Sequence, residues 1–420
     1  MSNPLLLDCI QIPDHTLTMR KVGLKLLLSI TGVLLGFTIA EVGIRLLGIA
    51  PPEVRSYDPV RGWQLKPGAI GLQRSEGHAL VTINAGGFRG PETSLAKPPG
   101  TLRVAVLGDS FVEAMHVPYD QTFCAVVERE LARCPLGGHR VQVLNFGVSG
   151  YGSGQELLTL QQQALRYAPD VVLLAFFAGN DVSDNSAALD SESWLNGEKC
   201  RPHFTVHSGA LVKDDEFREL PAANLWCHSV FWLNRLVIMD YVGEPVLLLQ
   251  RMTAGSRPTA QVAGHEPGLD DEIFSPPSAV QWREAWTMTE DIITTMSHEV
   301  KAHGARFVLV TLSTPIQVYP DATYRNAYLN RVGGTDLFYP EHRLNALGTR
   351  EGFPVLNLAP ALQVYADQHH AFLHGFPNTR EGTGHWNALG HRLAGEFIAR
   401  FLCDLMVQTA LPVPVPKNPL

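Results

Sequence analysis

The chain has 420 residues, of which 45% are hydrophobic and 18% are charged, a balance that suits an α/β core with insertions. Its net charge of −8 argues against a nucleic-acid partner, because non-specific binding to nucleic acid requires a basic face. The sequence has no Walker loop, no closely spaced cysteine pair and no internal repeat, so we expect neither a cofactor nor a metal.

An apolar segment near the N-terminus, residues 22–49, is long enough to cross a bilayer. Its first part, residues 26–40, carries no charge at all. We predict an uncleaved transmembrane anchor preceded by an extension of residues 1–21, because prolines occupy positions 51 and 52, where a signal peptide would be cleaved. A cleaved signal sequence and a buried core helix are the two alternatives.

Residues 50–100 contain many prolines and glycines and two short patches of alternating apolar residues. We expect strands at residues 62–67 and 80–84, followed by a glycine-rich exit turn at residues 86–90. The segment is therefore predicted to be a small β-rich stalk module, and a simple stalk without strands is the alternative.

The main domain is predicted to span residues 101–405, and it begins with alternating strands and helices. We expect strands at residues 102–107, 141–146 and 170–177, and helices at residues 122–134 and 156–167. The third strand is almost entirely apolar, so we expect both of its faces to be buried. Strands that alternate with helices predict right-handed parallel βαβ units and an α/β fold.

This alternation stops at residues 186–277, which we interpret as an insertion above the sheet. Within it, residues 230–248 are apolar enough for a packed helix that forms part of a substrate-binding lid. A second membrane contact is the alternative for this segment, although Asp240 and Glu244 interrupt it.

The alternation resumes after the insertion. We expect a helix at residues 279–303, strands at 306–312 and 354–358, and a closing helix at 387–403 with one apolar stripe. Residues 406–420 are rich in proline and are predicted to be a disordered tail.

The spacings of the six cysteines match no metal site. Cys124 and Cys134 fall on one predicted helix, where a rise of 1.5 Å per residue separates them by roughly 15 Å, which is too far for a disulfide. Cys200 and Cys227 lie in the same irregular region and would pair in an exported domain. Free buried thiols are the alternative for these two residues.

Four short stretches fall at the ends of the predicted elements, where open α/β sheets place their chemistry. They are Gly108-Asp109-Ser110, residues 147–152, Gly179-Asn180-Asp181 and Gly384-His385. The first three follow the first three strands, and the fourth precedes the last helix.

These stretches contain the groups that a nucleophilic serine needs. Ser110 requires a base to remove its proton, and His385 is suited to that role near neutral pH. The backbone N–H groups of Ser110 and Gly150 and the side-chain amide of Asn180 are candidate donors for an oxyanion hole. Each such donor contributes about 3–4 kcal/mol of transition-state stabilisation.

The order of these blocks resembles the SGNH (GDSL) hydrolase family, in particular its membrane-anchored bacterial members. The four letters correspond to Ser110, Gly150, Asn180 and His385. The resemblance covers about residues 100–185 and 300–403. It implies a three-layer α/β/α sandwich with a flavodoxin-like parallel sheet, and esterase, lipase or acyl-transfer chemistry without a metal. The chain also lacks the GxSxG nucleophile elbow of the other large serine-hydrolase fold.

One position departs from the family pattern. Members usually carry an aspartate two or three residues before the histidine, where this chain has Thr383 and Gly382. The nearest acid is Glu381, which we name as a candidate for orienting the His385 imidazole. A backbone carbonyl in that role, or a weakened enzyme, is the alternative.

Several other polar residues near these blocks are expected to be structural. They are Asp109, Asp181 and Asp184 as loop and capping acids, His391 as a structural residue rather than a ligand, and His369, His370 and His374 on a solvated helix face rather than at a metal. The glycines at positions 150, 152 and 154 lack the dinucleotide-binding spacing. A helix N-cap and a turn residue are the structural alternatives for Ser110 and Asn180.

We therefore predict a membrane-anchored serine esterase whose catalytic domain lies outside the cytoplasm. Its expected partners are the membrane and an acylated small molecule, lipid or glycan. An O-acyltransferase of cell-surface polysaccharide would use the same site. A catalytically weak SGNH-like envelope binding protein is the third interpretation, and it is favoured by the missing acid before His385.

Overall fold

A five-stranded parallel sheet with the strand order β11-β10-β7-β5-β6 lies at the centre of the protein. The computed structural model describes residues 15–46, 54–190, 198–207, 210–214, 221–233 and 269–409. The strands are β5 (Thr101–Gly108), β6 (Arg140–Asn145), β7 (Val171–Phe176), β10 (Arg306–Thr311) and β11 (Val355–Asn357). The five strands expected for the main domain are thus confirmed.

The direction in which the chain adds successive strands to the sheet reverses next to β5. The chain passes from β5 to β6 on one side, and β7 then pairs with the other side of β5, with Gly108 opposite Ala175. This is the flavodoxin-like order, in which ligands bind beyond the carboxyl ends of the first and third strands. The block that contains Ser110 begins at this point.

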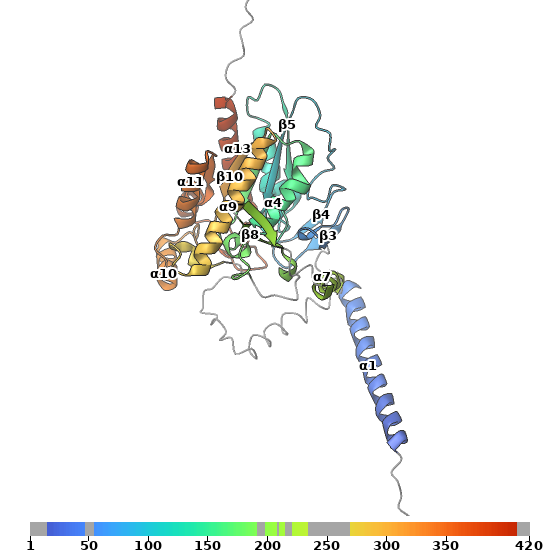
Figure 1. The fold of residues 1–420 in the computed structure, drawn as a ribbon. Coiled ribbons are helices and arrows are strands. Elements are labelled where there is room, and N and C mark those ends of the chain that lie inside the picture. Colours follow the sequence, from blue (N-terminus) through green and yellow to red (C-terminus); the bar gives the residue numbers. More distant parts are fainter. Residues whose placement is uncertain are drawn as a thin grey trace, which may run out of the picture.

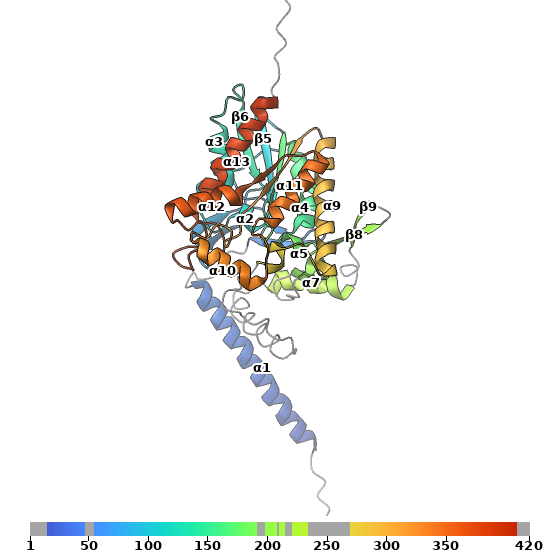
Figure 2. The same ribbon diagram turned by 90° about the vertical axis from the view of Figure 1, so that its left-hand side faces the viewer.

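Helices cover both faces of the sheet (Figure 2). On one face lie α4 (Ser153–Gln162), α9 (Val280–Ala302) and α11 (Tyr339–Glu351), and on the other lie α3 (Phe123–Leu131), α12 (Leu358–His369) and α13 (Ala388–Thr409). Alternate residues of β5 point into the two apolar cores, Ala105 and Leu107 into one and Val104 and Val106 into the other. The predicted three-layer α/β/α sandwich is confirmed.

Residues 54–100 contain two β-hairpins, and the two strands expected in this segment belong to different hairpins. The first pairs β1 (Arg55–Asp58) with β2 (Gly62–Leu65), and the second pairs β3 (Ile70–Gln73) with β4 (Ala79–Thr82). Trp63, Leu65 and Val81 share a buried cluster with Val148 and Tyr151 of the main domain. The hairpins are therefore packed against the sheet domain.

The described parts of the insertion are short elements. They are η3 (Glu198–Cys200), β8 (His203–His207), β9 (Ala210–Asp214) and α7 (Pro221–Leu233). A disulfide joins Cys200 to Cys227, so these cysteines pair rather than remain free. The helix expected at residues 230–248 lies outside the described residues, apart from the last turn of α7.

A second disulfide, which the sequence did not reveal, joins Cys134 to Cys403, and Cys124 is a buried free thiol. Cys403 lies on α13, which continues to Thr409. The prediction of a disordered tail from residue 406 is therefore wrong for residues 406–409, because α13 extends through them. Residues 410–420 lie outside the described part of the chain.

The N-terminal helix α1 (His15–Leu46) projects away from the domain (Figure 1). Its segment Gly23–Ile44 is long and apolar enough to cross a membrane, and none of its most apolar window is buried against the protein. The predicted apolar N-terminal helix is thus confirmed, and burial in a protein core is not its role.

Candidate active site

Ser110 and His385 meet at the carboxyl end of β5. Ser110 begins the short helix α2 (Ser110–Glu113), and its Oγ lies 2.8 Å from Nε2 of His385. Asp109 caps this helix, because its carboxylate accepts a hydrogen bond of 2.9 Å from the N–H of Phe111. Burial raises the pKa of Asp109 to about 6. Asp109 thus fixes the loop that presents the serine.

The segment around His385 is fixed on both sides. The carbonyl of Gly384 lies 2.7 Å from Nδ1 of His374, and the indole N–H of Trp386 donates to Oγ of Ser313 at 2.8 Å. His374 is only 1% exposed, so the expectation that it lies on a solvated helix face is wrong, whereas His369 and His370 are indeed exposed. His374 supports the backbone that carries His385.

The acid that faces His385 is Glu76 and not Glu381. Oε2 of Glu76 lies 2.7 Å from Nδ1 of His385, and Oε1 accepts a hydrogen bond of 2.7 Å from the backbone N–H of the same residue. Glu381 is exposed. Gly384 has a positive φ of 72°, and a Cβ at this position would lie 2.3 Å from Oε1 of Glu76. The backbone before His385 therefore leaves room for an acid that arrives from elsewhere in the chain.

Glu76 lies in the turn of the β3–β4 hairpin. Asn378, from the loop before His385, holds this turn by accepting a hydrogen bond of 3.0 Å from the N–H of Gly77. Its side-chain amide also donates to the carbonyl of Arg74 at 2.7 Å. The loop that carries the histidine and the hairpin that carries the acid are thus connected directly.

Hydrogen bonding keeps Glu76 ionised. Burial would raise the pKa of its carboxyl, but the hydrogen bonds from His385 and the electrostatic influence of the two nearby imidazoles outweigh this effect and lower the pKa to about 2. A carboxylate opposite Nδ1 of His385 favours the tautomer with the proton on Nδ1. The lone pair of Nε2 then faces the hydroxyl of Ser110, which is the arrangement of a general base.

His116 was not singled out in the sequence, yet it stacks on His385. The two ring centroids are 3.9 Å apart with an angle of 18° between the planes, and Nε2 of His116 lies 3.5 Å from Oε2 of Glu76. Burial and the nearby His385 lower the pKa of His116 to about 3, so the ring is neutral. It therefore acts as a second uncharged neighbour of the Glu76 carboxylate.

Glu76, His116 and His385 are close enough together to be considered as a metal site. However, ligand nitrogens bind a metal near the plane of their rings. Because the two imidazole planes are nearly parallel and stacked, one ion cannot lie close to both planes. The cluster in this conformation is better suited to exchanging a proton with Ser110 than to holding a metal.

The loop after β6 contains Gly150, the predicted second donor of the oxyanion hole. Gly150 has a positive φ of 77°, which glycine adopts without strain. The carbonyl of the preceding residue, Ser149, accepts a hydrogen bond of 3.2 Å from the indole N–H of Trp63, and this bond fixes the peptide that carries the Gly150 N–H. The hairpin module therefore orients this donor.

Two further groups hold the same loop. Arg201 of the insertion donates to the carbonyl of Gly150 at 2.9 Å, and its guanidinium lies 5.9 Å from the centroid of the Trp63 ring. The buried carboxylate of Glu113, on α2, accepts hydrogen bonds from both the N–H and the hydroxyl of Ser149. The Gly150 loop is thus fixed from the hairpins, from the insertion and from the helix that begins with Ser110.

Asn180, the predicted third donor, follows β7 and precedes the short helix α5 (Asp181–Asp184). Its Oδ1 is buried and has no hydrogen-bond partner among the described residues. Asp181 closes this turn by accepting a hydrogen bond of 2.8 Å from the N–H of Phe177, and Asp184 pairs with Arg201. The two aspartates are therefore structural, as expected, and Oδ1 of Asn180 takes no part in holding this turn.

Arg89, in the glycine-rich segment 86–90, is 1% exposed and holds the loop that follows Ser110. Its guanidinium donates to the carbonyls of Glu113 at 2.9 Å and Val117 at 2.7 Å. This explains why the exit turn of the hairpin module carries an arginine. His391, expected to be structural, is buried on α13, and its Nδ1 accepts a hydrogen bond of 3.4 Å from the N–H of Phe123.

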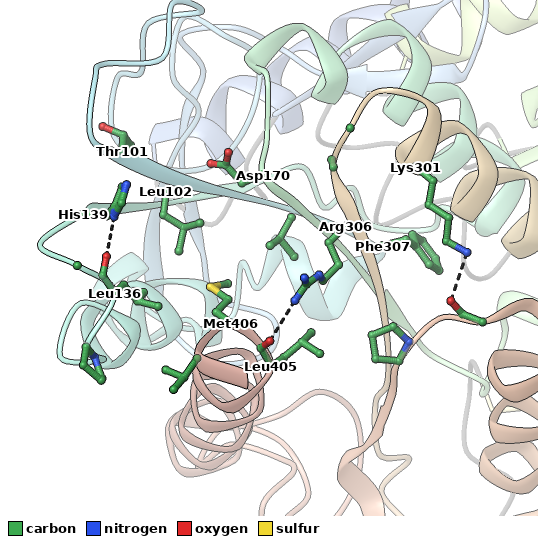
Figure 3. Close-up of a pocket in the computed structure, with 18 residues that line it drawn as sticks. Thr101, Leu102, Leu136, His139, Asp170, Lys301, Arg306, Phe307, Leu405 and Met406 are labelled. Carbon is green, nitrogen blue, oxygen red and sulfur yellow. Dashed lines mark hydrogen bonds between the residues drawn. The ribbon is translucent and has the colours of Figure 1, made fainter. Parts of the chain in front are cut away.

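A cavity of about 910 Å³ lies away from these residues (Figure 3). It is lined at the amino ends of the strands by Thr101, Val171 and Arg306, and Arg306 donates to the carbonyl of Leu405 at 3.1 Å. The serine and the histidine are at the opposite edge of the sheet, so this cavity is not the candidate active site.

Solved structures similar to this chain include hydrolases of esters. A lipase/acylhydrolase from Enterococcus faecalis is 15% identical and has a TM-score of 0.36, and the match covers 73% of this chain and 97% of that one. An acetylxylan esterase from Geobacillus stearothermophilus is 10% identical, with a TM-score of 0.35 and coverage of 74% and 96%. No family model matches the sequence, and a comparison with curated proteins finds no match.

Proposed function

We propose that this chain is a serine esterase or acylhydrolase of the SGNH type, with Ser110 as nucleophile, His385 as base and Glu76 as the acid that orients the base. The observation that carries the proposal is the double hydrogen bonding of one imidazole. Its Nε2 lies 2.8 Å from Oγ of Ser110 and its Nδ1 lies 2.7 Å from Oε2 of Glu76. A serine bonded to a histidine that is in turn bonded to an acid is the arrangement that activates a hydroxyl for acyl transfer.

In the first half of the reaction, Oγ of Ser110 attacks the carbonyl carbon of an ester while Nε2 of His385 takes the hydroxyl proton. The imidazolium that forms is stabilised by the carboxylate of Glu76. The tetrahedral intermediate then expels the alcohol, which receives the proton from Nε2. An acyl group remains on Ser110. In the second half, water attacks the acyl carbon while Nε2 of His385 takes its proton. The bond to Oγ of Ser110 then breaks, Oγ receives the proton from Nε2, and the carboxylic acid is released.

The developing oxyanion needs donors that are fixed before the reaction starts. The N–H groups of Ser110 and Gly150 are proposed for this role, together with the amide of Asn180. Trp63 and Arg201 hold the two peptide carbonyls on either side of the Gly150 N–H, which supports its assignment as a preorganised donor. The assignment of Asn180, through its side-chain NH2, is supported by its place directly after β7, the strand that pairs with the end of β5 next to Ser110.

We further propose that α1 anchors the protein in a membrane and that the catalytic domain lies outside the cytoplasm. The segment Gly23–Ile44 is sufficiently long and apolar, and its side chains are exposed. The disulfides Cys134–Cys403 and Cys200–Cys227 also fit an oxidising compartment. Detection of α1 in the mature membrane-bound protein by mass spectrometry would test the anchor, and a mature chain that begins after residue 49 would contradict it.

The activity is tested with the full chain in detergent. The wild type is expected to react with a fluorophosphonate probe and to hydrolyse a short-chain aryl ester. Ser110→Ala should do neither, while Ser94→Ala, at an exposed serine, should behave as the wild type. The absence of labelling in the wild type would contradict a nucleophilic serine.

The same assay separates hydrolysis from acyl transfer to a sugar hydroxyl, which would use the same acyl-enzyme. Addition of acceptor glycans should leave hydrolysis dominant if the protein is an esterase. Acyl transfer in preference to hydrolysis would identify an O-acyltransferase instead. The interpretation as a weak binding protein rested on the missing acid before His385, and Glu76 supplies an acid at that place.

A further inference from the structure

The outer face of the β3–β4 hairpin is apolar although it faces solvent. In its register Leu72 pairs with Leu80 and Ile70 pairs with Thr82. Val81, whose side chain alternates with that of Leu80 along β4, points inward and is fully buried, whereas Ile70 is 70% exposed and Leu80 is 60% exposed. A hairpin with one solvent face normally carries polar residues on that face, so this apolar surface requires an explanation.

The turn of the same hairpin carries basic residues. Arg74 and His78 are exposed on either side of Glu76, whose carboxylate is directed to His385. The hairpin thus combines an apolar face with basic groups at its tip. This combination matches the boundary between the acyl chains and the headgroups of an anionic bilayer.

The chain length limits how far the hairpin can lie from a membrane that holds α1. The helix ends at Leu46 and the described domain resumes at Val54. Eight residues span at most about 28 Å when fully extended. Val54 belongs to the same buried cluster as Val81 of β4, so this limit applies to the hairpin module itself.

The arrangement of the elements agrees with this limit. Both ribbon views place the hairpin module and α7 at the end of the domain nearest to α1 (Figures 1 and 2). The helix α7 also exposes an apolar side chain, Leu225, which is 69% exposed. The exposed apolar side chains of the hairpin and of α7 therefore lie at the end of the domain that faces α1.

We infer that the β3–β4 hairpin docks on the bilayer that holds α1, with Ile70, Leu72 and Leu80 in the acyl region and Arg74 and His78 at the lipid phosphates. The inference rests on the proposed membrane anchor and the proposed ester hydrolysis. Because Glu76 lies in the turn of this hairpin, docking brings the active site to the membrane surface. The substrate class that fits is an acyl ester carried by a lipid or another amphiphile of that membrane.

Docking is tested by the depth of a spin label on the full chain in nanodiscs that contain anionic lipid. The label is placed on Leu80→Cys, and His139→Cys, an exposed residue at the amino end of the sheet, is the matched control. Cys9 is replaced by serine in both samples, and Cys124, the free thiol among the described residues, is buried and should not react. The label at position 80 should collide with oxygen and be protected from a water-soluble nickel chelate, and the label at position 139 should show the reverse.

Two results would overturn the inference. Equal exposure of both labels to the nickel chelate would mean that the hairpin remains in water. Protection of position 80 from both oxygen and nickel would mean that protein, and not lipid, covers the hairpin. Neither readout depends on catalysis, so failure of docking is distinguished from failure of the proposed function.

Hydrolysis of membrane-borne and soluble esters tests whether docking of the hairpin brings the active site to its substrate. Ile70→Asp combined with Leu80→Asp should lower hydrolysis of a vesicle-borne ester at least tenfold and leave hydrolysis of a soluble aryl ester unchanged. Val212→Asp, at an apolar residue of β9 that is 43% exposed, is the control and should affect neither substrate. Equal losses on both substrates in the hairpin variant would contradict a role in reaching the membrane.

Discussion

Glu76 and His385 are 309 positions apart in the sequence and are joined by two hydrogen bonds, one to the imidazole and one to the backbone N–H of the histidine. The acid comes from a hairpin that precedes the first strand of the sheet. The candidate active site is therefore assembled from the sheet domain and from the module between that domain and α1.

Glu76→Gln is expected to lower kcat for ester hydrolysis by about a hundredfold or more, because loss of the carboxylate removes both the tautomer preference and the stabilisation of the imidazolium. Glu381→Gln is the matched control and should retain wild-type turnover, since Glu381 is exposed. Steady-state kinetics on an aryl ester measures both. A large loss with Glu381→Gln and none with Glu76→Gln would reverse the assignment.

The sheet and two of the three proposed catalytic residues could be predicted because their signals are local. Each strand of the sheet is a short apolar run, and Ser110 follows the first of them directly. His385 stands directly before the last helix. The strand order then brings these positions together, since the carboxyl ends of parallel strands share one edge.

Glu76 could not be predicted because its role depends on contacts between distant segments. In the sequence it is one polar residue in a turn, and only the packing of Trp63, Leu65 and Val81 against the main domain brings that turn to the histidine. The role of Arg201 could not be predicted for the same reason. It contacts the Gly150 loop from an insertion whose sequence has no regular pattern. Arg89 of the exit turn likewise reaches the loop after Ser110 through contacts that appear only in the fold.

Asn378→Ala is expected to lower kcat about tenfold, because the hairpin turn loses its hydrogen bonds at Gly77 and Arg74 and Glu76 is held less firmly. The substitution should have no further effect in the Glu76→Gln background, since both changes act through the same carboxylate. Kinetics of the two single variants and the double variant measure this coupling. Additive losses would show that Asn378 acts independently of Glu76.

Trp63→Phe is expected to lower kcat about tenfold with little change in KM. Phenylalanine keeps an aromatic ring in the cluster but cannot donate to the carbonyl of Ser149, so the Gly150 N–H is less well oriented toward the oxyanion. Trp282→Phe, at a partly buried residue of α9, is the control for loss of an indole. An unchanged kcat in Trp63→Phe would remove Trp63 from the support of the oxyanion hole.

The disulfide between Cys134 and Cys403 links the loop after α3 to α13, the helix that follows His385. Replacing both cysteines by serine is expected to lower the free energy of unfolding by about 2–5 kcal/mol, because the bridge closes a long loop in the unfolded chain. Denaturation of the detergent-solubilised chain measures this change. Treatment of the wild type with a reductant should lower the midpoint at least as much, because it also opens Cys200–Cys227. An unchanged midpoint in the double serine variant would show that the Cys134–Cys403 bridge is not formed.

Two buried carboxyls beneath the site make stability depend on pH. Burial raises the pKa of Glu156 and of Asp181 well above their usual values. Neither oxygen of Glu156 has a hydrogen-bond partner among the described residues, and both side chains are at most 1% exposed. The folded protein therefore binds more protons than the unfolded chain at pH values above about 4, where unfolded carboxyls ionise.

A group whose pKa is higher in the folded state stabilises the protein at low pH, and this stabilisation is lost as the pH rises toward the folded pKa, by about 1.4 kcal/mol per pH unit for each group. Glu156→Gln, which cannot ionise, should therefore lose less stability than the wild type between pH 5 and pH 8. Thermal unfolding at both pH values, with Glu284→Gln at an exposed position as control, measures the difference. Identical pH dependence in the wild type and Glu156→Gln would mean that Glu156 is ionised in the folded protein despite its burial.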